Sequence, residues 1–347
     1  MNSGAPHQGL TPPSQPRSDD EATLAGSKGG SQPEKMEAAQ KQAPAPAESS
    51  EQSTPEPTVV EKPPVDGPPP LPYNLREHKL TISIFWFLIL TECTLIPLIF
   101  YYTIANLTDM RRGAMFAIIT AMFGFISGGE YGLRGLRLCL KRDEYRPLNS
   151  PGRWGFDSTH LVLGPPYFVM TALMIGFSIP EPPITRGLSM IMAVGIIMVG
   201  VFMVWTGIAY HFQWRLRWFR LSSHVKGAIV PPLTFCIMED ICGCDGGGGK
   251  VYRTAAMARY NASPRFRRML VQMLWWWAIT AILLGAAQIA IIWIPQISQE
   301  VVYGIGWSVT SVWGGIGAWL TIWWGKKCIR IEKEKWAEDQ AAQLQRG

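Results

Sequence analysis

Apolar residues occur in six long runs after residue 80, and a polar, proline-rich sequence precedes them. The runs lie near 80–105, 113–135, 160–180, 188–211, 269–294 and 301–325. A bilayer core of about 30 Å needs about 20 apolar residues in a helix, so each run is long enough to cross it. Because backbone groups in lipid must find partners within their own segment, the pattern predicts an all-α bundle of six transmembrane helices.

The first 79 residues have the opposite character. They contain no aromatic residue before Tyr73 and more than half of the chain's 27 prolines. Such a segment cannot bury enough apolar surface to offset its ordering entropy, so we predict a disordered cytosolic tail over residues 1–79. Within it, Pro69–Pro72 (PPLP) is a polyproline-type segment of the kind that WW domains bind, and a stiff spacer beside the membrane explains it equally well.

Basic residues set the predicted orientation of the six helices. The connections 136–159 and 212–268 and the tail 326–347 are rich in Lys and Arg, whereas 180–187 and 295–300 hold only Arg186. This alternation predicts a multi-pass protein with both termini in the cytosol, although Arg111 and Arg112 lie in the first outer loop. The plasma membrane and secretory-pathway membranes, including the endoplasmic reticulum, fit this topology equally.

The positions of the basic residues also indicate the partners. The formal net charge is +6, but the cations cluster beside apolar runs, which indicates a lipid bilayer as the partner and not nucleic acid. The predicted cytosolic tail 326–347 is charged and helical in pattern. Cys139 and Cys328 lie beside predicted spans, where they are either acylated or free thiols.

The longest connection, 212–268, contains the stretch MEDICGCDGGGGKVYR at 238–253. Its candidate site residues are Glu239, Asp240, Asp245, Gly246, Gly247, Gly248, Gly249 and Arg253. A Walker phosphate loop would need a glycine at Cys244 and a hydroxyl at Val251, so that match fails, while a simpler amide nest for phosphate stays open. The one-residue spacing of Cys242 and Cys244 does not fit zinc. We therefore expect no metal and no cofactor.

An alternative for the same stretch is purely structural. It predicts a mobile glycine turn between an apolar strip at the membrane interface, residues 228–238, and a helix over 250–262. The strip is too short to cross a bilayer and contains Pro231 and Pro232.

A longer pattern includes this stretch. It comprises Glu239-Asp240, Asp245 to Gly249, Tyr252-Arg253, Arg259-Tyr260 and Ala262-Ser263-Pro264-x-Phe266-Arg267. The pattern resembles a motif of fungal multi-span proteins described only as integral membrane proteins, and the similarity runs from about residue 75 to 330. The resemblance implies a multi-span topology and no particular activity.

Polar residues inside the predicted spans form a second candidate site: Glu92, Glu130, Arg134 and Gln288. Glu92 lies about 18 Å along the first span. A charged residue there costs about 2.5–3.5 kcal/mol on insertion scales, so Glu92 either faces a functional cavity or is a protonated hydrogen-bonding group with Gln288 as its partner. Glu130 precedes Arg134 by one turn, a spacing that indicates a structural ion pair or one wall of a vestibule.

The sequence favours a membrane protein without an evident catalytic motif. We expect a transporter or channel-like protein for small solutes, with Glu92 facing an internal cavity. The alternative is a scaffold that recruits cytosolic proteins through the tail and the 212–268 loop. A lipid-modifying enzyme ranks third, because Glu92, Glu130, His160 and His211 are too scattered in the sequence to indicate an active site.

Overall fold

Helices account for the regular structure of this chain. The computed structural model describes residues 67–72, 77, 79–150 and 155–345, which belong to one unit, Pro63–Gly347. These residues contain no strand, only isolated β-bridges between Arg215 and Ile229 and between Leu221 and His224. The all-α prediction is therefore confirmed for them. Most of the tail predicted to be disordered lies outside the described residues.

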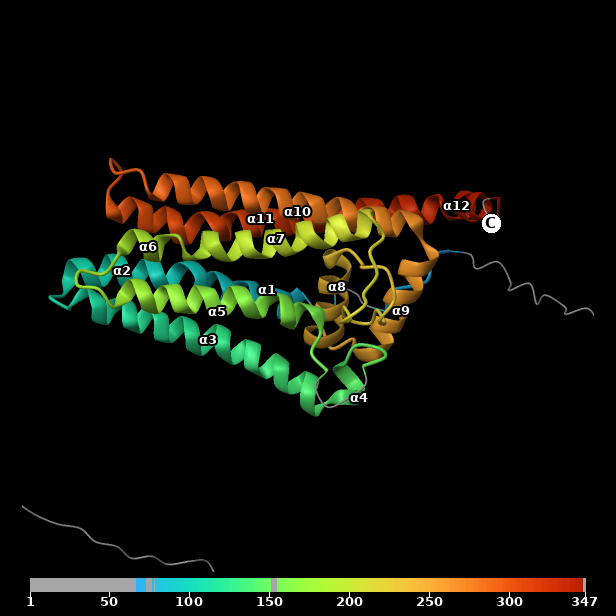
Figure 1. Ribbon diagram of the computed structural model, residues 1–347, viewed down its shortest axis with the longest axis horizontal. Coiled ribbons are helices and arrows are strands. Elements are labelled where there is room, and N and C mark those ends of the chain that lie inside the picture. The colour runs from blue at the N-terminus through green and yellow to red at the C-terminus, as the bar shows by residue number, and fades with distance from the viewer. Residues whose placement is uncertain (1–66, 73–76, 78, 151–154, 346–347) are drawn as a thin grey trace, which may run out of the picture. The chain divides into compact units, whose positions relative to one another are not determined.

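Six helical segments run lengthwise beside one another, alternating in direction (Figure 1). The first segment is α1 (Lys79–Leu90), a π-helical stretch η1 (Thr91–Leu95) and α2 (Ile96–Leu107), followed by α3 (Arg112–Leu140), α5 (Ser158–Ser178), α7 (Ile191–His211), α10 (Pro264–Ile292) and α11 (Gln299–Glu334). Short helices connect or extend them: α4 (Arg142–Tyr145), α6 (Thr185–Ser189), α8 (Leu233–Asp240), the π-helical η2 (Ile241–Asp245), α9 (Gly249–Ala262) and α12 (Trp336–Leu344). We call the end of the bundle that carries α8 and α9 the loop end.

Five helical stretches are long and apolar enough to cross a membrane. They are Trp86–Ile104, Arg112–Leu140, Ser158–Ser178, Ile191–His211 and Pro264–Ile292. The predicted sixth span, 301–325, lies within α11 and is not among them, because glycine, tryptophan, serine and threonine interrupt its aliphatic residues. Five of the six predicted spans are thus confirmed as helices that are long and apolar enough to cross a membrane.

Two prolines do not break α5. The helix continues from Ser158 to Ser178 through Pro165 and Pro166, although proline commonly kinks or breaks a helix. The fixed φ of proline is itself helical, and what proline removes is one backbone donor. Packing of α5 against α3 and α7 keeps the helix continuous despite the two lost donors.

Buried side chains form two clusters. One lies among α2, α3, α5 and α11, where the Tyr101 and Tyr303 rings stack with centroids 4.1 Å apart. The other joins α7, α8, α9 and α10 at the loop end. This second cluster includes the strip 228–238, because Leu233 and Phe235 of α8 are fully buried. The strip is therefore core and not an interfacial segment, which corrects the expectation. Leu71 of the PPLP segment packs against the same cluster.

Arginine side chains tie distant segments together. At the end opposite the loop end, Arg186 of α6 donates hydrogen bonds to the carbonyl oxygens of Ile292, Ile294 and Ile297 in the α10–α11 turn. At the loop end, Arg259 of α9 pairs with the buried Glu332 of α11. Arg265 lies 2.5 Å from Asp339 of α12. The C-terminal helices are thus held against the α9–α10 corner.

Candidate functional site

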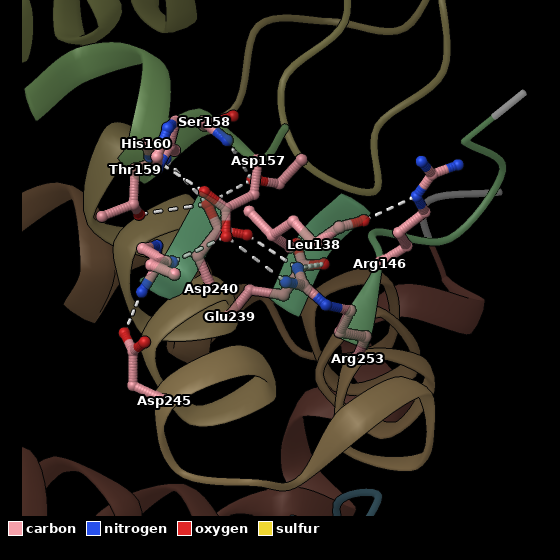
Figure 2. Close-up of polar contacts among 12 residues, drawn as sticks. Leu138, Arg146, Asp157, Ser158, Thr159, His160, Glu239, Asp240, Asp245 and Arg253 are labelled. Carbon is pink, nitrogen blue, oxygen red and sulfur yellow. Dashed lines mark hydrogen bonds and ion pairs between the residues drawn. The ribbon is translucent and has the colours of Figure 1, made fainter. Parts of the chain in front are cut away.

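A group of charged side chains, all of them buried except Asp245, lies at the loop end, and we call it the ion network. It consists of Arg134 from α3, Asp157 at the N-cap of α5, Glu239 and Asp240 from α8, Asp245 from η2 and Arg253 from α9. Three separate parts of the sequence therefore supply its six members: α3, the start of α5, and the consecutive elements α8, η2 and α9. Figure 2 shows Arg253 beside Glu239 and Asp240, with Asp157 next to them.

Arg253 is the centre of the ion network. Its side chain is fully buried, and its Nη1 atom lies 2.9 Å from Glu239 Oε1 and 2.7 Å from Asp240 Oδ1. Its Nη2 atom lies 3.6 Å from Asp157 Oδ2. One guanidinium thus faces three carboxylates in a fully buried environment, where such a charge is stable only when it is paired.

Asp157 has two roles in this geometry. As the N-cap residue of α5 it accepts a hydrogen bond from the backbone N–H of His160, 2.8 Å away, which satisfies a free donor at the helix start. Its other oxygen lies 2.6 Å from Arg134 Nη2. Arg134 also pairs with Asp245. The predicted partner of Arg134, Glu130, is therefore replaced by two acids from outside the span.

Hydroxyl groups surround the two carboxylates of α8. Asp240 accepts hydrogen bonds from the backbone N–H and hydroxyl of Thr159, both at 3.0 Å, and from Ser222 Oγ at 2.5 Å. Glu239 accepts one from Ser223. Ser222 has a φ of +43°, a strained backbone for a residue with a side chain. That strain places two successive hydroxyls beside the two acids.

Acids outnumber cations in the ion network, four to two. Burial raises the pKa of Glu239, and the charge of Asp240 raises it further, to about 7. Burial and the charge of Asp157 likewise raise the pKa of Asp240. Burial lowers the pKa of Arg253, but the charges of Asp240 and Glu239 outweigh it and keep the guanidinium protonated. The Glu239 Oε2 atom has no hydrogen-bond partner among the described residues. Burial and the neighbouring acids therefore favour the protonated forms of Glu239 and Asp240 more than those of exposed carboxyl groups.

The glycine run is an ordered turn between η2 and α9. Gly247 and Gly249 have φ angles of +71° and +54°, which favour glycine. A Cβ on Gly249 would lie 2.7 Å from the carbonyl oxygen of Glu144, so α4 also requires a glycine there. The predicted helix after the run is present as α9. The run thus sets the angle at which Arg253 enters the core.

The cysteines in the same stretch are free thiols. Cys244 is buried and Cys242 half-buried, and burial raises the pKa of both. No group of three or more His, Cys, Asp or Glu residues within the described part of the chain has the geometry of a metal site. The arrangement favours packing over thiolate chemistry.

Glu92 occupies the π-helical stretch η1 in the first span. It is buried and accepts hydrogen bonds from the backbone N–H of Ser127, at 3.0 Å, and from its hydroxyl. Pro97 has no N–H to donate to the carbonyl oxygen of Cys93. The missing hydrogen bond favours the wider π-helical turn of η1. The suggested partner Gln288 bonds elsewhere, to the carbonyl oxygens of Ile305 and Gly306 and to Thr310. The structure therefore does not bring Glu92 and Gln288 together as partners.

One face of α3 leads from Glu92 to the ion network. Ser127, Tyr131 and Arg134 follow one another at helical spacing. Tyr131 donates a hydrogen bond to the carbonyl oxygen of His160 at 3.0 Å, and the two rings stack with centroids 3.8 Å apart. His160 is itself bonded to Asp157 through its backbone. Polar groups therefore continue along α3 from the middle of the bundle to its loop end.

Sequence reasoning missed Asp157, Thr159 and the Ser222-Ser223 pair. Asp157-Ser158-Thr159 directly precedes an apolar run, which is a helix-start signature, so Asp157 was readable as an N-cap. Its second role depends on the packing of α5 against α8, which no local pattern reports.

Comparison with known proteins assigns the chain to a family but to no activity. A family model described as a domain of unknown function (DUF8766) matches residues 56–336. No curated protein and no solved structure matches the chain significantly. The match covers the whole bundle and the ion network.

Proposed function

Because the chain belongs to the DUF8766 family, whose function is unknown, we propose a function from the geometry alone. The protein is a membrane transporter that couples the movement of a small solute to protons, with Glu92 and the ion network as its two proton-binding sites. The observation that carries this proposal is the polar face of α3, which joins a buried carboxylate in the bundle to buried carboxylates at the loop end.

Spacing along α3 supports a proton path between the two sites. Ser127 contacts Glu92, and Arg134 contacts Asp157 and Asp245. Seven residues separate Ser127 from Arg134, which is about 10 Å along a helix. Tyr131 lies between them and carries a hydroxyl. Buried ionisable groups at successive depths are typical of proton relays in pumps and transporters.

The protonation behaviour of the ion network supports the same function. Glu239, whose pKa is raised to about 7, binds and releases a proton within the physiological range. Its protonation removes one of the negative charges that attract Arg253 and so weakens the contact between α8 and α9. A proton-dependent contact between two helices is the kind of element that alternates between states in a transporter.

We also propose that the bundle crosses the membrane six times, with the loop end in the cytosol. α11 supports the sixth crossing, because its 36 residues return along α10 to the loop end. The orientation rests on the Lys and Arg residues in the connections at that end. Two of the basic residues at the other end have local partners: Arg111 pairs with Glu181, and Arg186 is bonded to carbonyl oxygens.

The test is a transport assay on the full chain in proteoliposomes that contain a pH-sensitive dye. Gradients of sugars, amino acids, inorganic phosphate and metal cations are imposed one at a time. We expect at least one gradient to change the internal pH, and Glu92→Gln and Glu239→Gln to abolish that change. Glu338→Gln, the same chemical change at an exposed residue of α12, is the matched control and should leave it intact. Solute uptake without proton movement would contradict the proposal.

A further inference from the structure

The connection after α7 differs in charge and exposure from the rest of the loop end. No acidic residue occurs between 182 and 238, whereas Arg215, Arg217, Arg220 and Lys226 lie close together. We call residues 212–229 the aromatic-basic loop. Among the described residues, no carboxylate forms an ion pair with Arg215, Arg217 or Lys226. These three cations are therefore available to an external anion.

Aromatic rings of this loop face outward. Trp218 is 87 % exposed, more than any other large apolar side chain in the described part of the chain, and Phe212 is 65 % exposed. Trp214 and Phe219 are also exposed. Trp and Tyr rings concentrate at membrane interfaces, where one part of the ring system is in contact with lipid and another with headgroups and water.

One part of the loop lies beside the last turns of α7. The ring of Phe219 lies against Trp205 of α7, with centroids 6.0 Å apart. Trp205 precedes the end of α7 at His211 by six residues, about 9 Å along the helix. Phe219 is thus at the depth of the last turns of a helix that is apolar enough to span the bilayer.

The backbone of the loop is ordered and presents the exposed residues in fixed positions. Leu216 N–H donates to Ala228 at 2.8 Å, and Val230 N–H donates to Trp214 at 2.8 Å. Leu216 is buried beneath the loop. Arg215 donates to the carbonyl oxygen of Gly227 at 3.0 Å, which holds that cation across the two arms.

We infer that the aromatic-basic loop is a binding site for anionic phospholipids of the surrounding leaflet. Its rings enter the interfacial region beside α7, and Arg215, Arg217 and Lys226 bind the lipid phosphate and carboxylate groups. Each cation near an anionic surface strengthens binding about fivefold, and salt screens this attraction. The inference requires insertion of the bundle in a membrane but does not depend on transport.

Quenching of Trp218 fluorescence by brominated lipids tests the inference. The full chain is reconstituted in nanodiscs of phosphatidylcholine with increasing phosphatidylserine, and either lipid carries the bromine. The signal of Trp218 is the difference between each protein and its Trp218→Phe counterpart. We expect brominated phosphatidylserine to quench Trp218 at lower mole fractions than brominated phosphatidylcholine, and high salt to reduce the difference.

Three variants distinguish binding at this loop from a general effect of positive charge. Arg215→Gln with Arg217→Gln should reduce the preference for phosphatidylserine about 25-fold, because two cations are lost. The single variant Arg217→Gln should lose part of it without loosening the loop, since Arg217 has no hydrogen bond or ion pair within the described residues. The control variant, Arg330→Gln with Lys335→Gln, removes the same charge from two exposed residues outside the loop, one in α11 and one directly after it. It should keep the preference for phosphatidylserine.

Three results would overturn the inference. Equal quenching by both lipids would show that the loop does not select headgroup charge. Absence of quenching by either lipid would place Trp218 outside the bilayer. Loss of the preference when inorganic phosphate is added at constant ionic strength would identify free phosphate as the ligand of the cations.

Discussion

Arg253 is the side chain on which the ion network depends most, because three carboxylates face it and none of them has access to water. We predict that Arg253→Gln destabilises the protein by about 3–5 kcal/mol, since it leaves buried charges without a partner. Thermal unfolding in detergent measures the change. Arg330→Gln removes an exposed i,i+4 pair with Glu334 and should cost under about 1 kcal/mol. Similar unfolding temperatures for both variants would contradict the assignment.

His224 and Glu239 make stability depend on pH in opposite directions. Burial lowers the pKa of His224 from 6.5 to about 4, so its contribution is complete above pH 6.5 and is lost as pH falls toward 4. Burial raises the pKa of Glu239 from 4.5 to about 7, so its contribution is complete below pH 4.5 and is lost as pH rises toward 7. Both changes therefore occur in the same range of pH.

Substitutions separate the two contributions. His224→Asn should remove the loss of stability toward acid, and Glu239→Gln should remove the loss toward pH 7. Unfolding temperatures between pH 4 and pH 8 measure both, with Glu338→Gln as the control for the second. Parallel pH profiles for all proteins would show that neither group titrates within the folded core.

At the scale of elements, the glycine run determines how α9 leaves η2. We predict that Gly247→Ala costs about 1–2 kcal/mol, because a side chain there adopts an unfavourable left-handed backbone while meeting no neighbour. Gly249→Ala should cost more, because its Cβ also approaches the carbonyl oxygen of Glu144. Unfolding temperatures and limited proteolysis between η2 and α9 report the two effects. Equal losses of stability for the two variants would mean that α4 shifts and makes room for the new methyl group.

The elements differ in how far the sequence predicted them. Apolar runs predicted five spans to within a few residues, because helix length and composition are local properties. The continuity of α5 through Pro165 and Pro166 was not predictable in this way, since it depends on packing against α3 and α7. Burial of the strip 228–238 was missed for a related reason: a short apolar segment fits a protein core and a membrane interface equally well.

The candidate site was predictable only in part. Glu239, Asp240 and Arg253 lie within one short stretch, so their composition drew attention to them before the fold was known. Asp157 and Arg134 come from distant segments, and their place in the ion network follows from the packing of α3, α5 and α8. Glu92 was recognised from its depth in a span, but its contact with Ser127 depends on how α3 meets η1.

At the scale of the whole molecule, the number of crossings determines on which sides the two ends of α11 lie. We predict that cysteines introduced at Ser298 and Lys335, which flank α11, react from opposite sides of a sealed vesicle with an impermeant maleimide. A version of the chain without reactive native cysteines provides the background. Labelling of both positions from the same side would mean that α11 does not cross.

The members of the ion network are synthesised at different times, because they come from separate parts of the sequence. Arg134 and Asp157 are synthesised well before Arg253. At a translation rate of about 5–20 residues per second, at least several seconds pass before Arg253 is added. During that interval the first four spans are completed without the side chain that faces Asp157, Glu239 and Asp240 in the finished protein. Only when α9 has been made can the loop end close, while α10 and α11 are still to come. The ion network is thus completed by a residue that the ribosome adds only after four spans have been made.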